Sequence, residues 1–179
     1  MDVHGGRTDS AVLVPLFADQ AGDAHAVFTK RRENLKRHAG EISFPGGRRD
    51  DGETLMETAL REAHEEVGLP PDAVEIVGAL EPVGTFVTNY RIYPFVGLIE
   101  HGFEWVREEA EVAEVLEFAL EDLVAGHSLK RLVRRGVAFK TDVYEVDGHM
   151  VWGATSRILT DLLNRLEVGP RRPWRLEQE

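Results

Sequence analysis

Three glutamates near the middle of the chain have the spacing of a metal site. Glu62, Glu65 and Glu66 stand at positions i, i+3 and i+4, which places three carboxylates on one face of a helix. Such like-charge pairs repel each other by roughly 0.2–0.5 kcal/mol on an exposed helix. Mg²⁺ or Mn²⁺ would offset the repulsion, because hard cations prefer carboxylate oxygens. The alternative for an acidic cluster is an ordinary solvated helix face.

The residues around these glutamates predict a loop that is held against the helix. Gly46 and Gly47 precede the helix, and glycine lets the backbone approach a metal ion or a phosphate closely. Arg61 follows Glu57 by four residues and Glu53 by eight, so we expect it to pair with both of them. Glu53 and Arg61 are therefore expected to be scaffold residues.

Gly47 and the glutamates belong to a longer pattern that resembles the Nudix hydrolase box, G-x5-E-x7-R-E-U-x-E-E-x-G-U. The chain has Gly47, five residues, Glu53, seven residues and then REAHEEVGL, which ends at Leu69, and it matches every specified position. The resemblance implies a Nudix α/β/α sandwich, an α/β fold in which a mixed sheet lies between helices. It also implies hydrolysis of a nucleoside diphosphate linked to another moiety, with Mg²⁺ or Mn²⁺ as cofactor.

The same resemblance implies a role for each residue of the box. The metal ligands would be Glu62 and Glu66, with Glu65 as a further ligand and a carbonyl from the Gly46–Gly47 segment, taken as Gly47. The catalytic residues would be Glu62, Glu65, Glu66 and Arg61, and the scaffold of the box would be Gly47, Glu53, Arg61 and Gly68. The general base stays open between Glu62, acting through the metal shell, and two acids outside the box, Glu111 and Glu114.

The segment before the box resembles the signature of coenzyme A pyrophosphatases, L-L-T-x-R-S/A-x3-R-x3-G-x3-F-P-G-G. The chain reads VFTKRRENLKRHAGEISFPGG, in which Thr29, Arg31, Gly40 and the FPGG run match in register. It departs from the signature at Val27-Phe28, at Arg32, where a small residue is usual, and at Lys36, where arginine is usual. The resemblance implies cleavage of coenzyme A or its thioesters into 3′,5′-ADP and 4′-phosphopantetheine or its acyl form.

Basic residues in this segment are the candidate contacts for a polyanionic substrate. The residues expected to bind substrate are Arg31, Lys36, Arg37, His38 and Gly46. The alternative is that they are solvated loop charges. The box also allows other substrates, namely ADP-ribose, NADH, a dinucleoside polyphosphate or an oxidised nucleotide. A catalytically silent nucleotide-binding module is a third hypothesis, but such proteins usually lack box carboxylates, and this chain has all three.

Apolar periodicity predicts the elements that position these residues. Strands are expected at 11–17, 24–29, 74–80, 85–87, 91–99, 112–118 and 137–144. Helices are expected at 53–67, 120–123 and about 155–166. Pro45, Gly46 and Gly47 predict a loop, and the basic stretch 130–135 predicts a solvated helix or turn face.

Composition limits the class of protein. A chain of 179 residues is expected to form one domain over 1–179, with an ordered core at about 10–167 and a loose tail at 168–179. A net charge of −11 opposes broad binding to nucleic acid or to an anionic membrane. The partner that the Nudix resemblance implies is a small nucleotide substrate. The absence of cysteine excludes disulfides and thiolate metal sites and fits a cytoplasmic location. Nudix enzymes often form dimers, so the resemblance allows a homodimer.

Overall fold

The structure is a computed structural model that describes residues 7–36, 38–85 and 89–169. Its strands are β1 (Thr8–Ala18), β2 (Ala24–Arg31), β3 (Ile42–Ser43), β4 (Gly46–Arg48), β5 (Glu75–Ala79), β6 (Val83–Gly84), β7 (Tyr90–Leu98), β8 (Val112–Ala119), β9 (His127–Arg134), β10 (Val137–Val146) and β11 (His149–Val151). Its helices are α1 (Leu55–Val67), the 3₁₀ turn η1 (Pro71–Ala73), α2 (Leu120–Ala125) and α3 (Gly153–Arg165).

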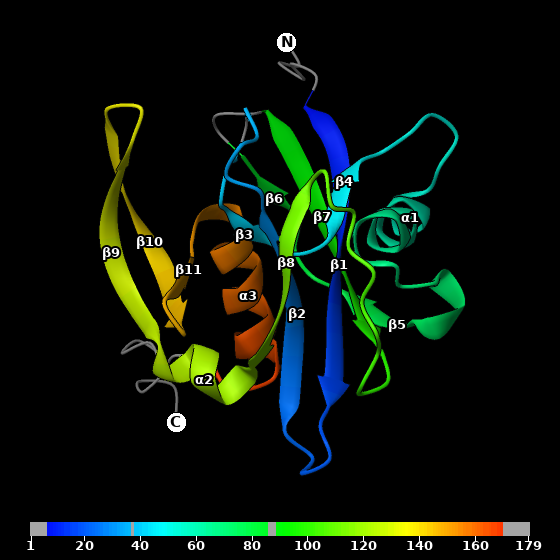
Figure 1. Cartoon of the computed structure of the whole chain (residues 1–179). Coiled ribbons are helices and arrows are strands. Elements are labelled where there is room, and N and C mark those ends of the chain that lie inside the picture. Colours follow the sequence, from blue (N-terminus) through cyan, green and yellow to red (C-terminus); the bar gives the residue numbers. More distant parts are fainter. Residues whose placement is uncertain (1–6, 37, 86–88, 170–179) are drawn as a thin grey trace.

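A mixed sheet forms the centre of the molecule, as predicted (Figure 1). Its strand order is β3-β2-β1-β7-β5, with β4 paired to β1, β6 to β7 and β8 to β2. Strands β1 and β7 run parallel from Thr8 opposite Tyr90 to Leu16 opposite Leu98, and the other pairs are antiparallel. The predicted strands at the start of the chain were right in type but short at their ends.

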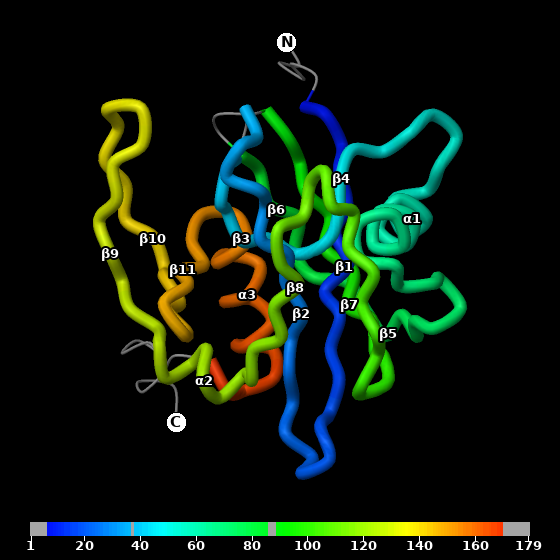
Figure 2. Tube along the Cα trace, viewed as in Figure 1, coloured from blue at the N-terminus to red at the C-terminus, as the bar shows by residue number. Residues whose placement is uncertain are grey.

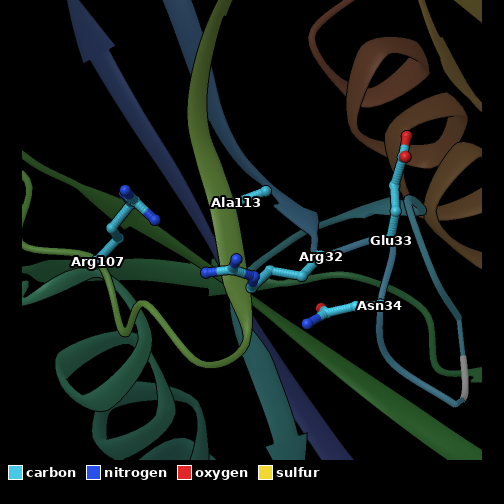
Figure 3. A pocket seen from close by; sticks show the side chains of 5 residues that line it. All are labelled: Arg32, Glu33, Asn34, Arg107 and Ala113. Atoms are coloured by element: carbon cyan, nitrogen blue, oxygen red, sulfur yellow. The ribbon is translucent and has the colours of Figure 1, made fainter.

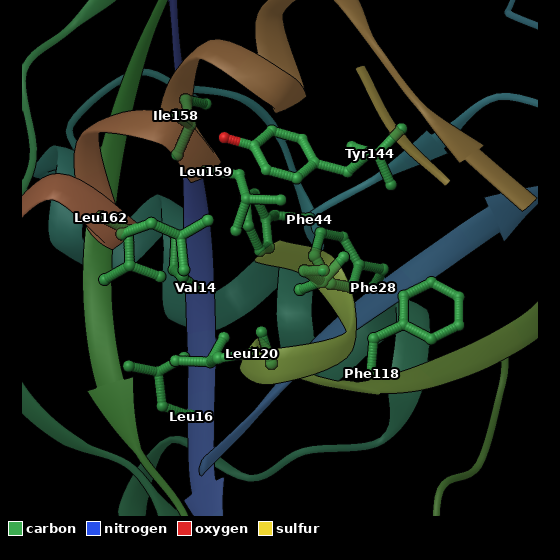
Figure 4. Close-up of a cluster of buried hydrophobic side chains, with 14 of the residues drawn as sticks. Val14, Leu16, Phe28, Phe44, Phe118, Leu120, Tyr144, Ile158, Leu159 and Leu162 are labelled. Carbon is green, nitrogen blue, oxygen red and sulfur yellow. The ribbon is translucent and has the colours of Figure 1, made fainter. Parts of the chain in front are cut away.

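The two faces of β1 hold the two helical layers together. Successive side chains of a strand point to opposite faces, so Ala11 and Leu13 pack with the apolar side of α1, whereas Val14 and Leu16 pack with α3. Figure 4 shows the second cluster, in which Leu159 and Leu162 of α3 meet the strands. The expected arrangement, a sheet between helices, is therefore confirmed.

A second sheet differs from the prediction for residues 130–135. Residues 130–134 belong to strand β9, which forms a three-stranded antiparallel sheet with β10 and β11, and only Arg135 stands in the turn that follows. Figure 2 shows this sheet on the far side of α3 from the central strands. Exposed and half-buried positions alternate along β9, but charged and apolar residues occur on both faces, so polarity showed no period of two in this stretch.

The Pro45-Gly46-Gly47 segment also differs from the predicted loop. Gly46 and Gly47 begin strand β4 and lie opposite Val12 and Ala11 of β1. Phe44 holds the segment in place, because its buried ring stacks on Phe28 with the centroids 4.6 Å apart. A glycine pair is a weak strand former by itself, so tertiary pairing with β1 decides this structure.

The first and last described residues can be compared with the predicted bounds of the ordered core. Strand β1 begins at Thr8, two residues before the predicted start of the ordered core. Residues 168 and 169 of the expected loose tail donate backbone hydrogen bonds to the Leu163 carbonyl, and the remainder of that tail, 170–179, lies outside the described residues. In the described parts of the chain, every helix is too short or too polar to span a membrane.

Candidate active site

Helix α1 carries the three glutamates, and local sequence determines both of its ends. Thr54 is the N-cap: its side chain accepts from the Glu57 N–H, while the Glu57 carboxylate accepts from the Thr54 N–H, which is a capping box. Gly68 ends the helix in the left-handed conformation, with φ 73°, where a Cβ would be strained. The helix therefore starts at Leu55, two residues after the predicted start at Glu53.

The three glutamates are buried to very different extents. Glu66 is 9% exposed, the Glu62 side chain is 17% exposed and the Glu65 side chain is 59% exposed. The gradient follows the orientation of α1, because Ala59, Ala63 and Val67 pack on the sheet and Glu66 is adjacent to Val67. Spacing predicted the shared helix face, whereas the burial of Glu66 depends on the sheet beneath it.

The backbone of Gly46 and Gly47 lies close to the carboxylates of Glu62 and Glu66. The backbone of Gly46 lies close enough to the Glu66 carboxylate to lower its pKa. A Cβ added to Gly47 would come within 2.5 Å of Oε1 and 2.6 Å of Cδ of Glu62. The structure thus brings Gly46, Gly47, Glu62 and Glu66 together, as expected for the loop and the helix.

Burial and mutual repulsion disfavour the charged forms of these acids. Burial, together with the charges of Glu62 and Glu111, raises the pKa of Glu66 to about 8, while the Gly46 backbone and the charge of Arg31 oppose the rise. Burial also raises the pKa of Glu62, against the opposing charge of Arg61. Buried carboxylates that repel one another are unfavourable in their charged forms, and a bound divalent cation would stabilise those forms.

The donor set tests whether a metal ion fits here. Glu62 and Glu66 offer carboxylate oxygens beside the glycine backbone, the ligand chemistry that Mg²⁺ and Mn²⁺ prefer. Glu65 is turned toward Arg61, with its Oε2 3.2 Å from Nη1. In the described part of the chain, no three acidic or histidine side chains converge closely enough to form a ready metal site. The geometry therefore fits a two-carboxylate site, and Glu65 would have to leave Arg61 before it could become a third ligand.

Arg61 links the helix to the loop before it. Its guanidinium donates to Glu53, to Glu62 at 3.1 Å and to Glu65 at 3.2 Å, and it also reaches the Arg48 carbonyl at 3.2 Å. The hydrogen bond from Arg61 holds the pKa of Glu53 well below its usual range, at about 2. The pairing with Glu53 was predicted correctly, and that with Glu57 was wrong, because Glu57 is occupied in the capping box.

The upstream basic residues do not all lie with the carboxylates. Arg31, at the end of β2, has a positive charge that lowers the pKa of Glu66, and its Nε is buried with no hydrogen-bond partner among the described residues. His38 instead shares a hydrogen bond of 2.8 Å between its Nδ1 and Glu41, and Lys36 is exposed in the loop between β2 and β3. Arg37 lies outside the described residues.

Two acids outside the box, Glu111 and Glu114, were predicted as possible general bases, and Glu111 is the one that interacts electrostatically with the site. Its charge raises the pKa of both Glu62 and Glu66. Glu114 lies on β8, opposite Lys30 of β2. The preceding segment is held over the end of α1, where Val106 and Glu108 donate backbone hydrogen bonds to the carbonyls of Val67 and Glu66. This tertiary contact, which no sequence spacing indicated, brings Glu111 near the helix.

Comparison with known proteins agrees with the geometry. A family model described as the NUDIX domain matches residues 7–138. A protein from Enterobacter sp. (strain 638), named uncharacterized Nudix hydrolase NudL, is 37% identical over 169 residues, which cover 92% of this chain and 85% of that protein. A protein of the same name from Salmonella paratyphi B (strain ATCC BAA-1250 / SPB7) is 39% identical with the same coverage.

A solved structure gives the same fold. The MutT/nudix family protein from Enterococcus faecalis superposes with a TM-score of 0.60 at 15% sequence identity, covering 93% of this chain and 64% of that one. An identity this low supports only a likeness of fold, whereas the family model and the two relatives match this chain in sequence. The chain therefore belongs to the Nudix hydrolase family.

Proposed function

We propose that this Nudix hydrolase cleaves the diphosphate bond of coenzyme A or its thioesters, giving 3′,5′-ADP and 4′-phosphopantetheine or its acyl form. The observation that carries the proposal is Arg31, a residue of the coenzyme A pyrophosphatase signature. Its charge acts on Glu66, and its buried Nε has no hydrogen-bond partner among the described residues. A guanidinium with an unused donor beside acidic metal ligands is well suited to a phosphate oxygen.

Different residues of the chain have different proposed roles around that diphosphate. Glu62 and Glu66, with Glu65 and the Gly47 carbonyl, would hold Mg²⁺ or Mn²⁺. The ion supplies charge neutralisation at the phosphate oxygens and makes a bound water more acidic. Arg61 positions Glu62 and the loop, since it bonds Glu62, Glu53 and the Arg48 carbonyl. Arg31 binds a phosphate oxygen and thereby orients the scissile bond.

The reaction needs one proton acceptor. Water attacks one phosphorus, a new P–O bond forms, and the bond from that phosphorus to the bridging oxygen breaks. The bridging oxygen leaves on the other phosphate, and the attacking water loses a proton. We assign that proton to Glu111, because it is exposed to solvent and its charge acts on both Glu62 and Glu66.

Product analysis tests the proposal. Purified protein is incubated with coenzyme A and with Mg²⁺, Mn²⁺ or chelator, and the products are separated by chromatography. We expect metal-dependent formation of 3′,5′-ADP and 4′-phosphopantetheine, and loss of that turnover in Glu62→Gln. Glu75→Gln, an exposed acid on β5, is the matched control and should retain turnover.

A substrate panel separates coenzyme A from the other substrates that the box allows. Values of kcat/KM are compared for coenzyme A, acetyl coenzyme A, ADP-ribose, NADH and a dinucleoside polyphosphate. Preference for coenzyme A or its thioester supports the assignment. Cleavage confined to another nucleoside diphosphate derivative would contradict the coenzyme A assignment but not the hydrolase activity. In that case Arg32 is the first residue to replace with the small residue that is usual in the signature. Full turnover in Glu62→Gln would instead contradict the metal site.

A further inference from the structure

An open pocket of about 430 Å³ lies beside strand β8. It is lined by Arg32, Glu33, Asn34, Arg107 and Ala113 (Figure 3). Arg32 is the residue that departs from the coenzyme A pyrophosphatase signature, and Arg107 comes from the segment that covers the end of α1. Two guanidinium groups from distant parts of the chain therefore face one hollow in a protein with a net charge of −11.

Both guanidinium groups are held by neutral carbonyls. Arg32 Nη1 donates to the Glu109 carbonyl at 2.6 Å, and Arg107 Nη1 donates to the Val112 carbonyl at 3.0 Å. Among the described residues, Arg32 has no carboxylate within 4.0 Å, and Arg107 has only Glu109, at 4.0 Å, whose side chain is 81% exposed. Carbonyls fix the position of a guanidinium without neutralising its charge, and an exposed pair at that distance neutralises little.

The remaining walls suit an anion. Asn34 offers an amide that can donate hydrogen bonds. In Figure 3 the Arg32 side chain extends toward the side on which Arg107 lies, whereas Glu33 stands on the other side of Arg32 and its carboxylate points toward neither guanidinium group. The pocket is thus lined by two fixed cations and one neutral donor, and its one carboxylate is directed away from them.

The pocket also adjoins the reacting groups. The Arg32 N–H donates to the Glu111 carbonyl at 3.1 Å, and the preceding residue, Arg31, acts on Glu66. Arg31 acts on a carboxylate of the candidate site and the next residue, Arg32, lines the pocket, so the pocket and the carboxylates are neighbours.

We propose that this pocket binds a phosphate monoester carried by the nucleoside part of the substrate, with Arg32 and Arg107 as its paired ligands. Two planar guanidinium groups can each donate two parallel hydrogen bonds to one phosphate. The inference rests on the proposed function, in which the substrate's 3′-phosphate is the group bound. It assigns to Arg32 and Arg107 the discrimination between nucleotides with and without this phosphate.

Comparison of two substrates tests the pocket. Values of kcat/KM are measured for coenzyme A and 3′-dephospho-coenzyme A with the wild type, Arg32→Ala and Arg107→Ala. We expect the wild type to prefer coenzyme A and each variant to reduce that ratio about tenfold, the loss typical of one charge-assisted contact. Arg131→Ala changes an exposed arginine on β9 and should leave the ratio unchanged. A ratio equal to that of the wild type in both pocket variants would overturn the proposal.

A binding measurement separates failure of the pocket from failure of the proposed function. Calorimetry compares adenosine 3′,5′-bisphosphate with adenosine 5′-monophosphate on the wild type, Arg107→Ala and Arg107→Lys. Tighter binding of the bisphosphate that Arg107→Ala abolishes supports the pocket even if coenzyme A is not cleaved. Equal binding of both nucleotides to the wild type overturns the pocket even if coenzyme A is cleaved. Arg107→Lys keeps the charge without the planar fork, so it serves if Arg107→Ala does not fold.

Discussion

The Glu62 carboxylate occupies the space that a side chain on residue 47 would take: a Cβ at Gly47 would lie 2.5 Å from Glu62 Oε1. Real Cβ atoms do not approach oxygen so closely, so the glycine and the position of the glutamate depend on each other. Because the oxygen is at the end of a flexible side chain, the conflict is relieved by moving the carboxylate and not the backbone. Residue 47 therefore controls the position of the Glu62 carboxylate, a proposed metal ligand.

Gly47→Ala tests this relationship. We expect kcat to fall about 100-fold, because a displacement of roughly 1 Å at a catalytic group costs that much. We expect little change in the melting temperature, since only the end of a side chain must move. Steady-state kinetics and thermal unfolding measure the two effects. Gly78→Ala is the matched control, because a Cβ there meets nothing within 4 Å. An equally active Gly47→Ala enzyme would contradict the prediction.

Glu66→Gln tests the buried ligand. With a pKa of about 8, Glu66 must take up a proton when the metal-free chain folds at neutral pH, whereas glutamine is neutral in both states. The metal-free variant is therefore expected to melt about 2–4 °C higher. The same variant should lose the Mn²⁺-dependent rise in melting temperature, because a ligand stabilises only the state that binds it. Scanning calorimetry with chelator and with Mn²⁺ measures both. A normal Mn²⁺-dependent rise in Glu66→Gln would remove Glu66 from the ligand set.

Acid should weaken the contact between the loop and the helix. The pKa of Glu53 is about 2 in the folded protein, against an ordinary 4.5, because Arg61 donates hydrogen bonds to its carboxylate. The unfolded chain then binds more protons between these values, so the stability that Glu53 contributes is present above pH 4.5 and is lost as the pH falls toward 2. Urea unfolding across this range should show a shallower pH dependence in Glu53→Gln.

A control makes the acid experiment specific. Glu145 pairs with Lys130 at 3.0 Å on the second sheet, and both side chains are well exposed. Glu145→Gln should follow the wild type across the same pH range, because exposed pairs contribute little. Identical pH dependence in wild type and Glu53→Gln would show that the Glu53–Arg61 contact does not stabilise the folded state.

Glu111→Gln and Glu114→Gln separate the two candidate bases outside the box. Loss of a general base lowers kcat by about 10²–10⁴. We expect a loss of this size in Glu111→Gln, whose charge acts on Glu62 and Glu66, and nearly normal turnover in Glu114→Gln. Mn²⁺ affinity, measured by calorimetry, should be retained in both variants if neither is a ligand. The reverse order of effects would assign the proton to Glu114.

The box and its helix were accessible from sequence because their determinants are local. Three- and four-residue spacing puts Glu62 and Glu66 on one face of α1, and Thr54 and Gly68 end the helix through contacts made within a few residues. The longer strands of the central sheet were predicted from apolar runs in the same way, whereas the short strands β3, β4 and β6 were not. Such features need no knowledge of what packs against them.

Contacts between segments that are distant in sequence determine the features of the fold and the site that local patterns did not predict. Pairing with β1 makes a strand of Gly46 and Gly47, and pairing with β10 makes a strand of the basic stretch in β9. The bonds from Val106 and Glu108 to the end of α1 bring Glu111 to the carboxylates, and Arg107 opposite Arg32. Arg31 and Arg32 are adjacent in sequence, yet the charge of Arg31 acts on Glu66 whereas Arg32 lines the pocket beside β8. The sequence by itself determined which acids share a helix face; only tertiary packing determined their burial and their neighbours, because both depend on surfaces that the chain brings together from far apart.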